Sequence, residues 1–566
     1  MGMGATNTLD RVAASIGALD TVPVTFASCM DVPSGGVLLA LPALLAIGLL
    51  RHAKDFFQLK RGYYALESIF LLLALMALSR IQTIESLRYY APGEWGKLLG
   101  LDRIPEARTL RRKVKDLAVG DNPRKWSARL CAAWMEADPE SAGTLYIDGH
   151  VRVYHGHKTA LPRHYVARER LCLRAETDYW VNAMDSQPFF VITKTVDPGL
   201  LRTLRDDIVP RLRAGIPGQP SGEHLSKDPL LHRFTMVFDR EGYSPDFLLE
   251  MKKERIACLT YHKYQGEDWP HDEFRPCTVP FSHGNTIDLR LAERGLHLSG
   301  KIWLREIRKL SDSGHQTSIL ATDYVSDLAP IAAAMFSRWS QENFFKYMRE
   351  HYSLDHLVDY NLTPLPDTTR LVNPDYRSLD SQVRSKTSML SRKLAQFGAI
   401  SLEGDLDPEK VGGYQKKKAG MHEEIKNLQE EVTTLKEKRK NVARHMSVAE
   451  LPEDDRLSAL STESRHLIDT IKMIAYRAET AMAQLLKETM SRNDDARTLL
   501  RAIYRTEADL LPDHEEGMLT VRLHHLANRN SDDAIRHLCD ELNSTETIFP
   551  GTNLRLFYEL VSSKNP

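Results

Sequence analysis

The chain has 566 residues, enough for several domains, and its 75 basic and 76 acidic side chains give a net charge of -1. Apolar residues at 42% and charged residues at 27% exclude a disordered or collagen-like chain. The charge balance excludes a histone-like protein, although a local basic face could still bind nucleic acid. Six cysteines without a CxxC pair exclude a zinc ribbon and a disulfide scaffold, and they predict a cytoplasmic location.

Residues 1–90 are predicted to form an N-terminal helical bundle. Two apolar runs lie at 35–50 and 69–78, and each is shorter than the roughly 20 residues that a helix needs to cross a bilayer. We therefore expect buried helices packed on each other and no stable membrane association. The alternative is a membrane hairpin, which would make the protein an anchored scaffold.

Residues 91–135 have a helix-turn-helix-like pattern. A short helix is predicted at 93–101, a turn at 102–105 and a second helix at 106–115, with Pro105 near its first turn. Four basic residues share one face of the second helix at i, i+3, i+4 and i+7, as a DNA reader would require. The alternative is a solvated basic helix. These residues are Arg108, Arg111, Arg112 and Lys115.

Residues 140–265 show the periodicity of an α/β domain. Strands are predicted at 144–148, with a turn at Gly149 and a further strand-like piece at 151–154, and at 178–183, 188–196, 234–238 and 257–264. Helices are predicted at 200–213 and, after Ser244 and Pro245, up to residue 256. This order predicts a mixed sheet with crossover helices. Asp148 and Asp239 each close a strand, where sites of open α/β sheets lie.

Residues 266–323 are predicted to be a β-rich insertion, with strands at 277–281, 286–291, 302–310 and 316–321. A helix is predicted from residue 328 onward, within the segment 324–362. On that helix Met335, Arg338, Glu342 and Arg349 would share one face, with one carboxylate between two guanidinium groups.

Three motifs in this region resemble those of bacterial insertion-sequence transposases of the DDE type. They are Tyr-Ile-Asp-Gly-His at 146–150, Val-Phe-Asp-Arg-Glu-Gly-Tyr-Ser at 237–244 and Arg-Trp-Ser-Gln-Glu-Asn-Phe-Phe-Lys at 338–346. The resemblance covers roughly residues 140–360. More specifically, the motifs resemble those of the branch that has a β-rich insertion and a Tyr-Arg-Glu-Lys signature. Met335 stands where that branch has Tyr, and Arg349 stands where it has Lys.

The resemblance implies a ribonuclease-H-like catalytic core that cleaves and joins DNA strands. Asp148, Asp239 and Glu342 would be the catalytic acids and would hold two Mg²⁺ or Mn²⁺ ions, with Asp148 bridging both. Such hard cations prefer oxygen ligands, and a pair of them can serve the attacking and leaving oxygens of phosphodiester cleavage. Glu241 is the alternative to Asp239, and Asp323 is the alternative to Glu342.

The implied partners are double-stranded DNA, both the terminal inverted repeats and the target, and a second subunit when DNA ends are paired. Arg338, Lys346 and Arg349 would contact DNA phosphates. The protein would be associated with the bacterial nucleoid. The chain contains no P-loop, HExxH or GxSxG motif, which argues against other enzyme classes. A non-catalytic DNA-binding protein of the same fold is the second hypothesis.

The C-terminal third is predicted to contain a linker at 363–414, an antiparallel coiled-coil hairpin at 415–490 and a small α/β unit at 491–566. Apolar residues from Met421 to Val442 follow a heptad pattern, a loop is expected near 451–455, and apolar residues from Leu457 to Ile474 predict the returning helix. The hairpin could be solvated, contact a second subunit or clamp DNA. The last unit is predicted to contain a strand at 518–524, a helix at 531–543 and β-like residues at 545–558.

Overall fold

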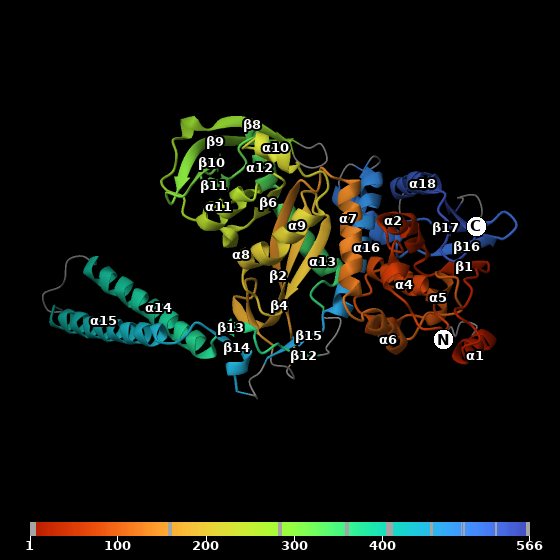
Figure 1. Ribbon diagram of the computed structural model, residues 1–566, viewed down its shortest axis with the longest axis horizontal. Coiled ribbons are helices and arrows are strands. Elements are labelled where there is room, and N and C mark those ends of the chain that lie inside the picture. Colours follow the sequence, from red (N-terminus) through yellow and green to blue (C-terminus); the bar gives the residue numbers. More distant parts are fainter. Residues whose placement is uncertain are drawn as a thin grey trace. The chain divides into compact units, whose positions relative to one another are not determined.

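The fold is given by a computed structural model, shown in Figure 1, that has a mixed sheet at its centre. It describes residues 7–156, 161–280, 286–356, 362–402, 411–452, 457–487, 490, 493–526 and 529–561. Five strands form the middle of this sheet in the order β5-β4-β2-β6-β7. They are β2 (Thr144–Val153), β4 (Leu171–Ala183), β5 (Pro188–Lys194), β6 (Thr235–Phe238) and β7 (Ala257–Tyr261).

The strand directions identify the fold class. β2 is antiparallel to β4, β4 is antiparallel to β5, and β2, β6 and β7 run parallel to one another. This order and these directions are those of a ribonuclease-H-like core, so the predicted fold class is confirmed. One detail of the prediction is wrong. β2 does not turn at Gly149 but continues to Val153, because residues beyond Asp148 still pair with β4.

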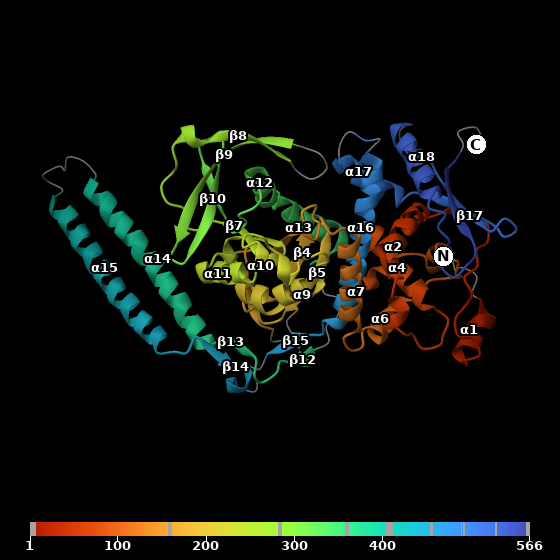
Figure 2. The same ribbon diagram turned by 45° about the horizontal axis from the view of Figure 1, so that its top comes forward.

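The predicted β-rich insertion is confirmed, and it extends the same sheet. β8 (Arg275–Pro280), β9 (Thr286–Leu298) and β10 (Ile302–Leu310) form an antiparallel series that ends in β11 (Gln316–Ala321). β11 pairs with β7, so these strands (green in Figure 2) form one ten-stranded sheet with the core. β3 (Arg163–Val166) pairs with β4 on the other side.

Helices connect the parallel strands. The predicted crossover at 200–213 is a helical run with a π-helical turn in its middle, and the predicted helix after Ser244 begins where expected. The Ser244 hydroxyl caps it by accepting a hydrogen bond from the backbone N–H of Phe247, and Pro245 occupies its first turn. These elements are α8 (Leu200–Thr203), η3 (Leu204–Ile208), α9 (Val209–Gly215), α10 (Gly222–Lys227) and α11 (Pro245–Lys253).

One long helix, α16 (Glu463–Lys487), lies in the hydrophobic core, where it packs on α7 and α4 (Figure 1). The prediction that this stretch returns along the coiled coil is therefore wrong. Its apolar positions pack against the N-terminal helices, which form one core with it rather than a separate bundle. Those helices are η1 (Gly35–Ala40), α2 (Leu41–Ile47), α3 (Ala53–Phe56), α4 (Leu66–Leu78), η2 (Ile84–Tyr89) and α7 (Asn122–Ala137).

The two N-terminal apolar runs are buried as expected. Twelve of the thirteen residues of α4 are buried, so its apolar character serves the core. Among the described residues, no helix combines the length and the apolar character that crossing a membrane requires.

The C-terminal unit contains a strand from the other end of the chain. The predicted strand and helix are present as β17 and α18. The sheet order is β1-β16-β17-β18, so β1, near the N-terminus, supplies an edge strand that local periodicity did not reveal. The elements are α1 (Thr8–Ser15), β1 (Cys29–Val32), α17 (Asn493–Ile503), β16 (Ala508–Asp513), β17 (Met518–Leu523), α18 (Arg529–Asn543) and β18 (Arg555–Leu560).

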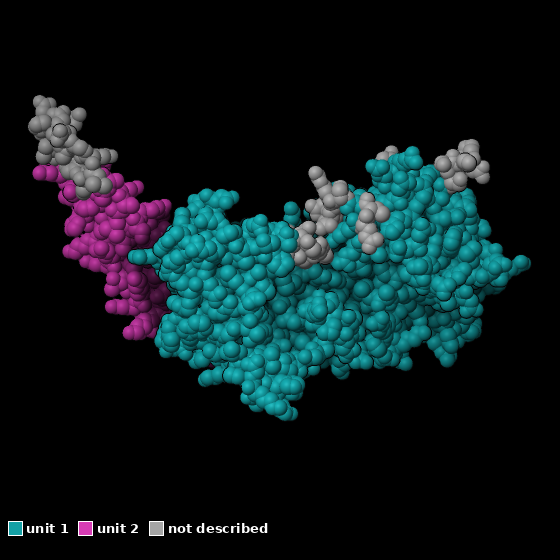
Figure 3. Space-filling model, turned by 90° about the horizontal axis from the view of Figure 1, so that it is seen from above, with its two compact units in different colours: residues 1–155, 163–361, 460–566 teal, residues 156–162, 362–459 magenta. Residues whose placement is uncertain are grey.

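The chain forms two compact units, coloured separately in Figure 3. Residues 362–459 belong to the smaller unit, in which α14 (Pro374–Leu402) and α15 (Val411–Lys440) form an antiparallel hairpin. The predicted hairpin exists, but its first arm is α14, within the stretch predicted to be a linker. Ion pairs between Lys386 and Glu431 and between Lys393 and Glu424 fix the pairing.

The smaller unit also contains short strands that pair two by two, β12 with β15 and β13 with β14. The loop predicted near 451–455 falls partly outside the described residues. The elements are β12 (Leu362–Pro364), β13 (Arg370–Val372), β14 (His445–Ser447), η8 (Val448–Glu450) and β15 (Ser458–Leu460).

Candidate active site

Asp148 and Asp239 lie side by side at the same edge of the core sheet. The last paired positions of the parallel strands β2 and β6 are Ile147 and Phe238, and each aspartate is the next residue along the chain. Adjacent strands lie about 4.8 Å apart, and residues in register point to the same face. The two carboxylates, 91 positions apart in sequence, are therefore neighbours.

Backbone amides orient both carboxylates. Asp148 Oδ1 accepts a hydrogen bond of 2.8 Å from the N–H of Gly149, and Asp239 Oδ1 accepts one of 2.7 Å from the N–H of Arg240. Asp239 thereby begins the short helix η4 (Arg240–Gly242). A side chain at Gly242 would clash with the ring of Phe238, so this tight turn requires glycine.

The third acid comes from a helix that docks on the sheet. The predicted continuous helix is wrong, because it breaks at Ser337 and Arg338 into α12 (Leu328–Phe336) and α13 (Trp339–Tyr352). Met335 is fully buried in α12, so it does not share a face with Glu342. On α13 the Gln341 side-chain amide, fully buried, reaches the carbonyls of Tyr146 and Trp180. This anchor fixes the first turn of α13, which carries Glu342, beside β2.

Arg338 connects the acids of the sheet to Glu342. Its guanidinium lies 3.6 Å from Asp148 Oδ2 and 2.7 Å from Glu342 Oε1. The Arg338 side chain is 11% exposed, while those of Asp148 and Glu342 are 29% and 61% exposed. The arginine was predicted to contact DNA phosphates. In this structure it stands between two of the predicted acids and neutralises part of their charge, and its contact with DNA stays a prediction.

The proton affinity of Asp148 reflects these neighbours. Burial of its carboxyl, together with the nearby charges of Asp239 and Glu241, raises the pKa of Asp148 to about 6. Arg338 and the Gly149 amide act in the opposite direction. The pKa of Arg338 is itself raised, because the attraction of Asp148, Asp239 and Glu342 exceeds the cost of its burial. Negative charge is therefore concentrated at this edge, and Arg338 balances part of it.

The donor set fits hard divalent cations, since three carboxylates offer only oxygen ligands. The spacing is wider than in a closed metal site. Among the described residues, Asp148, Asp239 and Glu342 are not a group whose ligand atoms all lie within 4.8 Å of one another. Arg338, paired with both Asp148 and Glu342, occupies the space between them.

The whole sequence matches a known family. Residues 2–562 match the family described as "Transposase protein". The chain belongs to this transposase family. No curated protein matches it in sequence.

A solved structure, the cryo-EM structure of a piggyBac transposase synaptic complex with hairpin DNA, is similar to this transposase-family chain at 12% identity and a TM-score of 0.29. The similarity covers 55% of this chain and 65%, less than two thirds, of the piggyBac chain. A likeness this low carries no information about activity.

The two alternative acids have different positions in this transposase-family chain. Asp323 is buried at 4% exposure, and its carboxylate accepts hydrogen bonds from the backbone amides of Val325 and Ser326. It follows the antiparallel strand β11, next to Cys258 near the beginning of β7, and so lies at the opposite edge of the sheet. Asp323 is therefore a turn residue.

Glu241 lies much closer to the two aspartates. Partial burial of its carboxyl and then the charges of Asp197 and Asp239 raise the pKa of Glu241. Glu241 therefore remains the alternative to Asp239.

The proposed DNA contacts are exposed. Lys346 and Arg349 lie on the exposed face of α13, together with Glu342. The four basic residues of the N-terminal module are exposed on α6 (Ala107–Leu117), where Arg111 also pairs with Glu85 at 2.5 Å. The preceding helix α5 (Pro92–Lys97) is shorter than predicted, and residues 98–106 join the two. That connection is longer than the three or four residues of a helix-turn-helix, so the predicted motif is absent.

Tyr261 is a further residue at this edge. Tyr261 ends β7 and follows Thr260, which pairs with Phe238, so Tyr261 continues the row of Asp148 and Asp239. Its ring lies 5.6 Å from the Arg240 guanidinium and 5.8 Å from that of Arg338. The sequence offered no signal for Tyr261 beyond its place within the strand predicted at 257–264, which in the structure ends at this residue.

His150, the last residue of the motif at 146–150, is a hydrogen-bonded core residue. The ring is buried, its Nε2 lies 2.6 Å from Asp355 Oδ1, and it stacks on Phe345.

Proposed function

We propose that this protein is a DNA transposase that cleaves and joins strands at the terminal inverted repeats of an insertion sequence. The observation that supports the proposal most directly is the in-register placement of Asp148 and Asp239, with Glu342 tied to the same edge through Arg338. Family membership supports the same class of reaction.

Asp148, Asp239 and Glu342 would hold divalent metal ions, Mg²⁺ or Mn²⁺, which supply a polarised water nucleophile and stabilise the leaving oxygen. The chain's own residues orient the three acids and balance part of their charge. The amides of Gly149 and Arg240 hold the two aspartates, and the Gln341 anchor holds the helix that carries Glu342. Arg338 would exchange its carboxylate partners for a DNA phosphate, which offers the same forked acceptor geometry.

Double-stranded DNA would bind along α13 and α6. Lys346 and Arg349 would contact phosphates next to the acids, and Arg108, Arg111, Arg112 and Lys115 would contact phosphates at a second place on the DNA. Since pairing two DNA ends requires two active sites, we expect a homodimer on DNA.

The test is strand nicking and strand transfer on terminal-repeat DNA with Mg²⁺. Asp148→Ala and Glu342→Ala should abolish both reactions. Glu350→Ala is a matched control for Glu342, because it lies on the same helix with the same 61% exposure, and it should retain activity. Unchanged nicking in both acid variants would refute the site. DNA binding without any nicking in the unaltered protein would favour a non-catalytic DNA-binding protein of this fold.

A further inference from the structure

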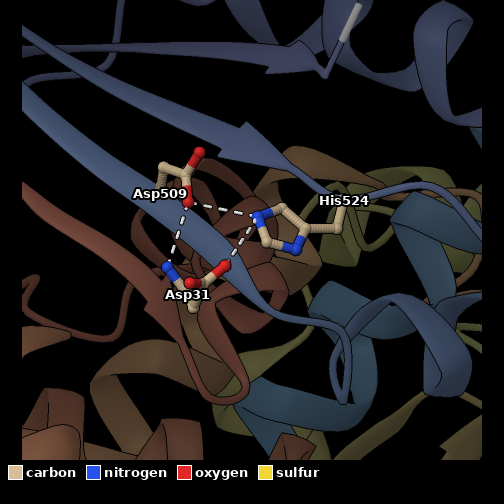
Figure 4. Close-up of side chains that lie close together, drawn as sticks. All are labelled: Asp31, Asp509 and His524. Carbon is tan, nitrogen blue, oxygen red and sulfur yellow. Dashed lines mark hydrogen bonds and ion pairs between the residues drawn. The ribbon is translucent and has the colours of Figure 1, made fainter. Parts of the chain in front are cut away.

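A second group of metal-binding side chains lies far from the acids of the core sheet, in the four-stranded sheet that joins the two ends of the chain. Asp31 comes from β1, Asp509 from β16, and His524 directly follows β17. Among the described residues, these three form a group whose ligand atoms all lie within 4.8 Å of one another. Figure 4 shows the three side chains turned toward one another.

The distances fit a tetrahedral ion. His524 Nε2 lies 3.1 Å from Asp509 Oδ1 and 3.7 Å from Asp31 Oδ1. Ligand atoms that surround a zinc ion at about 2.0–2.1 Å in a tetrahedron are about 3.4 Å apart, between the two observed values. Only small side-chain movements would thus close the group around one ion.

A simple ion pair does not account for the arrangement. A single ring nitrogen can donate only one N–H, yet two carboxylate oxygens converge on Nε2 of His524. A protonated imidazole would balance only one of the two carboxylates. The Asp509 side chain is only 4% exposed. A divalent cation would balance its buried charge.

Backbone features aim the ligands at this point. The pairing of β1 with β16 shifts between Cys29 and Val32, and at this irregularity Asp31 has φ 53°, which turns its side chain toward β17. The Asp31 amide donates a 3.0 Å hydrogen bond to Asp509 Oδ1. On the far side of the imidazole, Glu507 Oε2 lies 3.9 Å from Nδ1 of His524. Carboxylates commonly orient metal-bound histidines by accepting a hydrogen bond from this nitrogen, for which Glu507 would have to move closer.

We propose that Asp31, Asp509 and His524 bind one zinc ion that fastens β1 to β16 and β17. Nitrogen and carboxylate ligands together suit zinc better than Mg²⁺, and water would complete the coordination, because Asp31 is 71% exposed. The ion would hold the strand at residues 29–32 against segments almost 500 positions away. This site shares no residue with the proposed active site, so either proposal can fail alone.

The test is zinc binding to the full-length protein, by equilibrium dialysis in excess Mg²⁺ so that sites for hard cations are saturated. We expect one zinc ion per chain, and a melting temperature that rises with zinc concentration. His524→Ala should weaken zinc binding at least about tenfold. His525→Ala is the matched control, because its ring pairs with Asp532 instead, and it should bind zinc normally.

A second variant tests the proposal if His524→Ala fails to fold. Asp31→Asn keeps the exposed position and the backbone hydrogen bond, and asparagine tolerates positive φ. This variant should fold normally and bind zinc more weakly. The proposal is overturned if the unaltered protein binds no zinc, or if folded His524→Ala and Asp31→Asn both bind zinc as the unaltered protein does.

Discussion

Asp148 and Asp239 are one residue beyond the last paired positions of two neighbouring parallel strands, and they therefore face the same side of the sheet. Tyr261 continues the row on the next strand. Parallel strands in register align their carboxyl ends, so one sheet edge gathers residues that the sequence separates widely. A charge cluster of this kind persists in the folded chain because Arg338 lies against it.

The choice between Asp239 and Glu241 can be tested directly. Asp239→Asn should reduce Mg²⁺-dependent nicking about a thousandfold, equivalent to about 4 kcal/mol of lost transition-state stabilisation. Glu241→Gln should stay within a few fold, because its exposed side chain lies on η4 rather than in register with Asp148. Rates of nicking under single-turnover conditions give both values. The reverse order of effects would assign the metal to Glu241.

Arg338 should set the pH range of the reaction. The positive guanidinium favours the charged form of Asp148, so Arg338→Gln should raise the pKa of Asp148 further above about 6. Since metal binding needs the carboxylate, the acidic limb of the pH–rate profile should shift to higher pH. Arg338→Lys keeps a positive charge, so its acidic limb should lie closer to that of the unaltered protein. Arg349→Gln, in the last turn of α13, is the control. It should weaken DNA binding without changing the pH of the acidic limb.

The basic face of α6 should contribute salt-dependent DNA affinity. Each lost phosphate contact reduces the slope of log affinity against log salt by about 0.9. Arg108→Ala and Arg112→Ala should each show this change, and Arg111→Ala less of it, because Glu85 already pairs with Arg111. Titrations of terminal-repeat DNA at several salt concentrations measure the slope. Arg202→Ala, exposed at 66% on α8, is the control, and an equal effect there would refute the role of α6.

The α14–α15 hairpin should unfold separately from the larger unit. Ile425 is buried at 5% exposure between the two helices, so Ile425→Asp places an uncompensated charge there and should cost more than about 3 kcal/mol. Hydrogen exchange should accelerate in α14 and α15 and stay unchanged in β2 and β4. Lys386→Gln removes a surface ion pair and should change stability by less than about 1 kcal/mol.

Lys472 should make stability depend on alkaline pH. Burial lowers the pKa of Lys472 to about 8, whereas an unfolded lysine titrates near 10.4. Between these values the unfolded chain binds more protons, so the free energy of unfolding rises with pH. Lys472→Met should therefore stabilise the protein at pH 7 by up to about 3 kcal/mol, less the lost hydrogen bond to the Ser353 carbonyl.

The gain from Lys472→Met should shrink as the pH approaches 10, because the buried lysine is then neutral in the folded state and no longer carries a desolvated charge. Denaturant unfolding at pH 7 and at pH 10 measures the difference. Lys227→Met, at an exposed position, should show no such pH dependence. A gain of the same size at both pH values would contradict the explanation.

Most errors of the sequence-based predictions concern which segments pack together. The apolar spacing from Leu457 to Ile474 did predict a helix, but the same spacing suits a coiled coil and a core helix, and α16 turned out to be buried among the N-terminal helices. The polar composition at 374–402 concealed the helix α14. β1 has only four residues, too few for a period to emerge. The break at Ser337 and Arg338 follows no glycine or proline and left no local signal.

The sequence by itself determined most elements of the core and the β-rich insertion, because side-chain periodicity is a local property, and it supplied three acids as candidates. Only the tertiary structure decided that Asp148 and Asp239 are in register, that Arg338 stands between the acids, and that Asp31 meets Asp509 and His524. These relationships depend on which strands pair and which helices bury one another. Strand pairing and helix packing depend on contacts throughout the core, and a short stretch of sequence carries no information about those contacts.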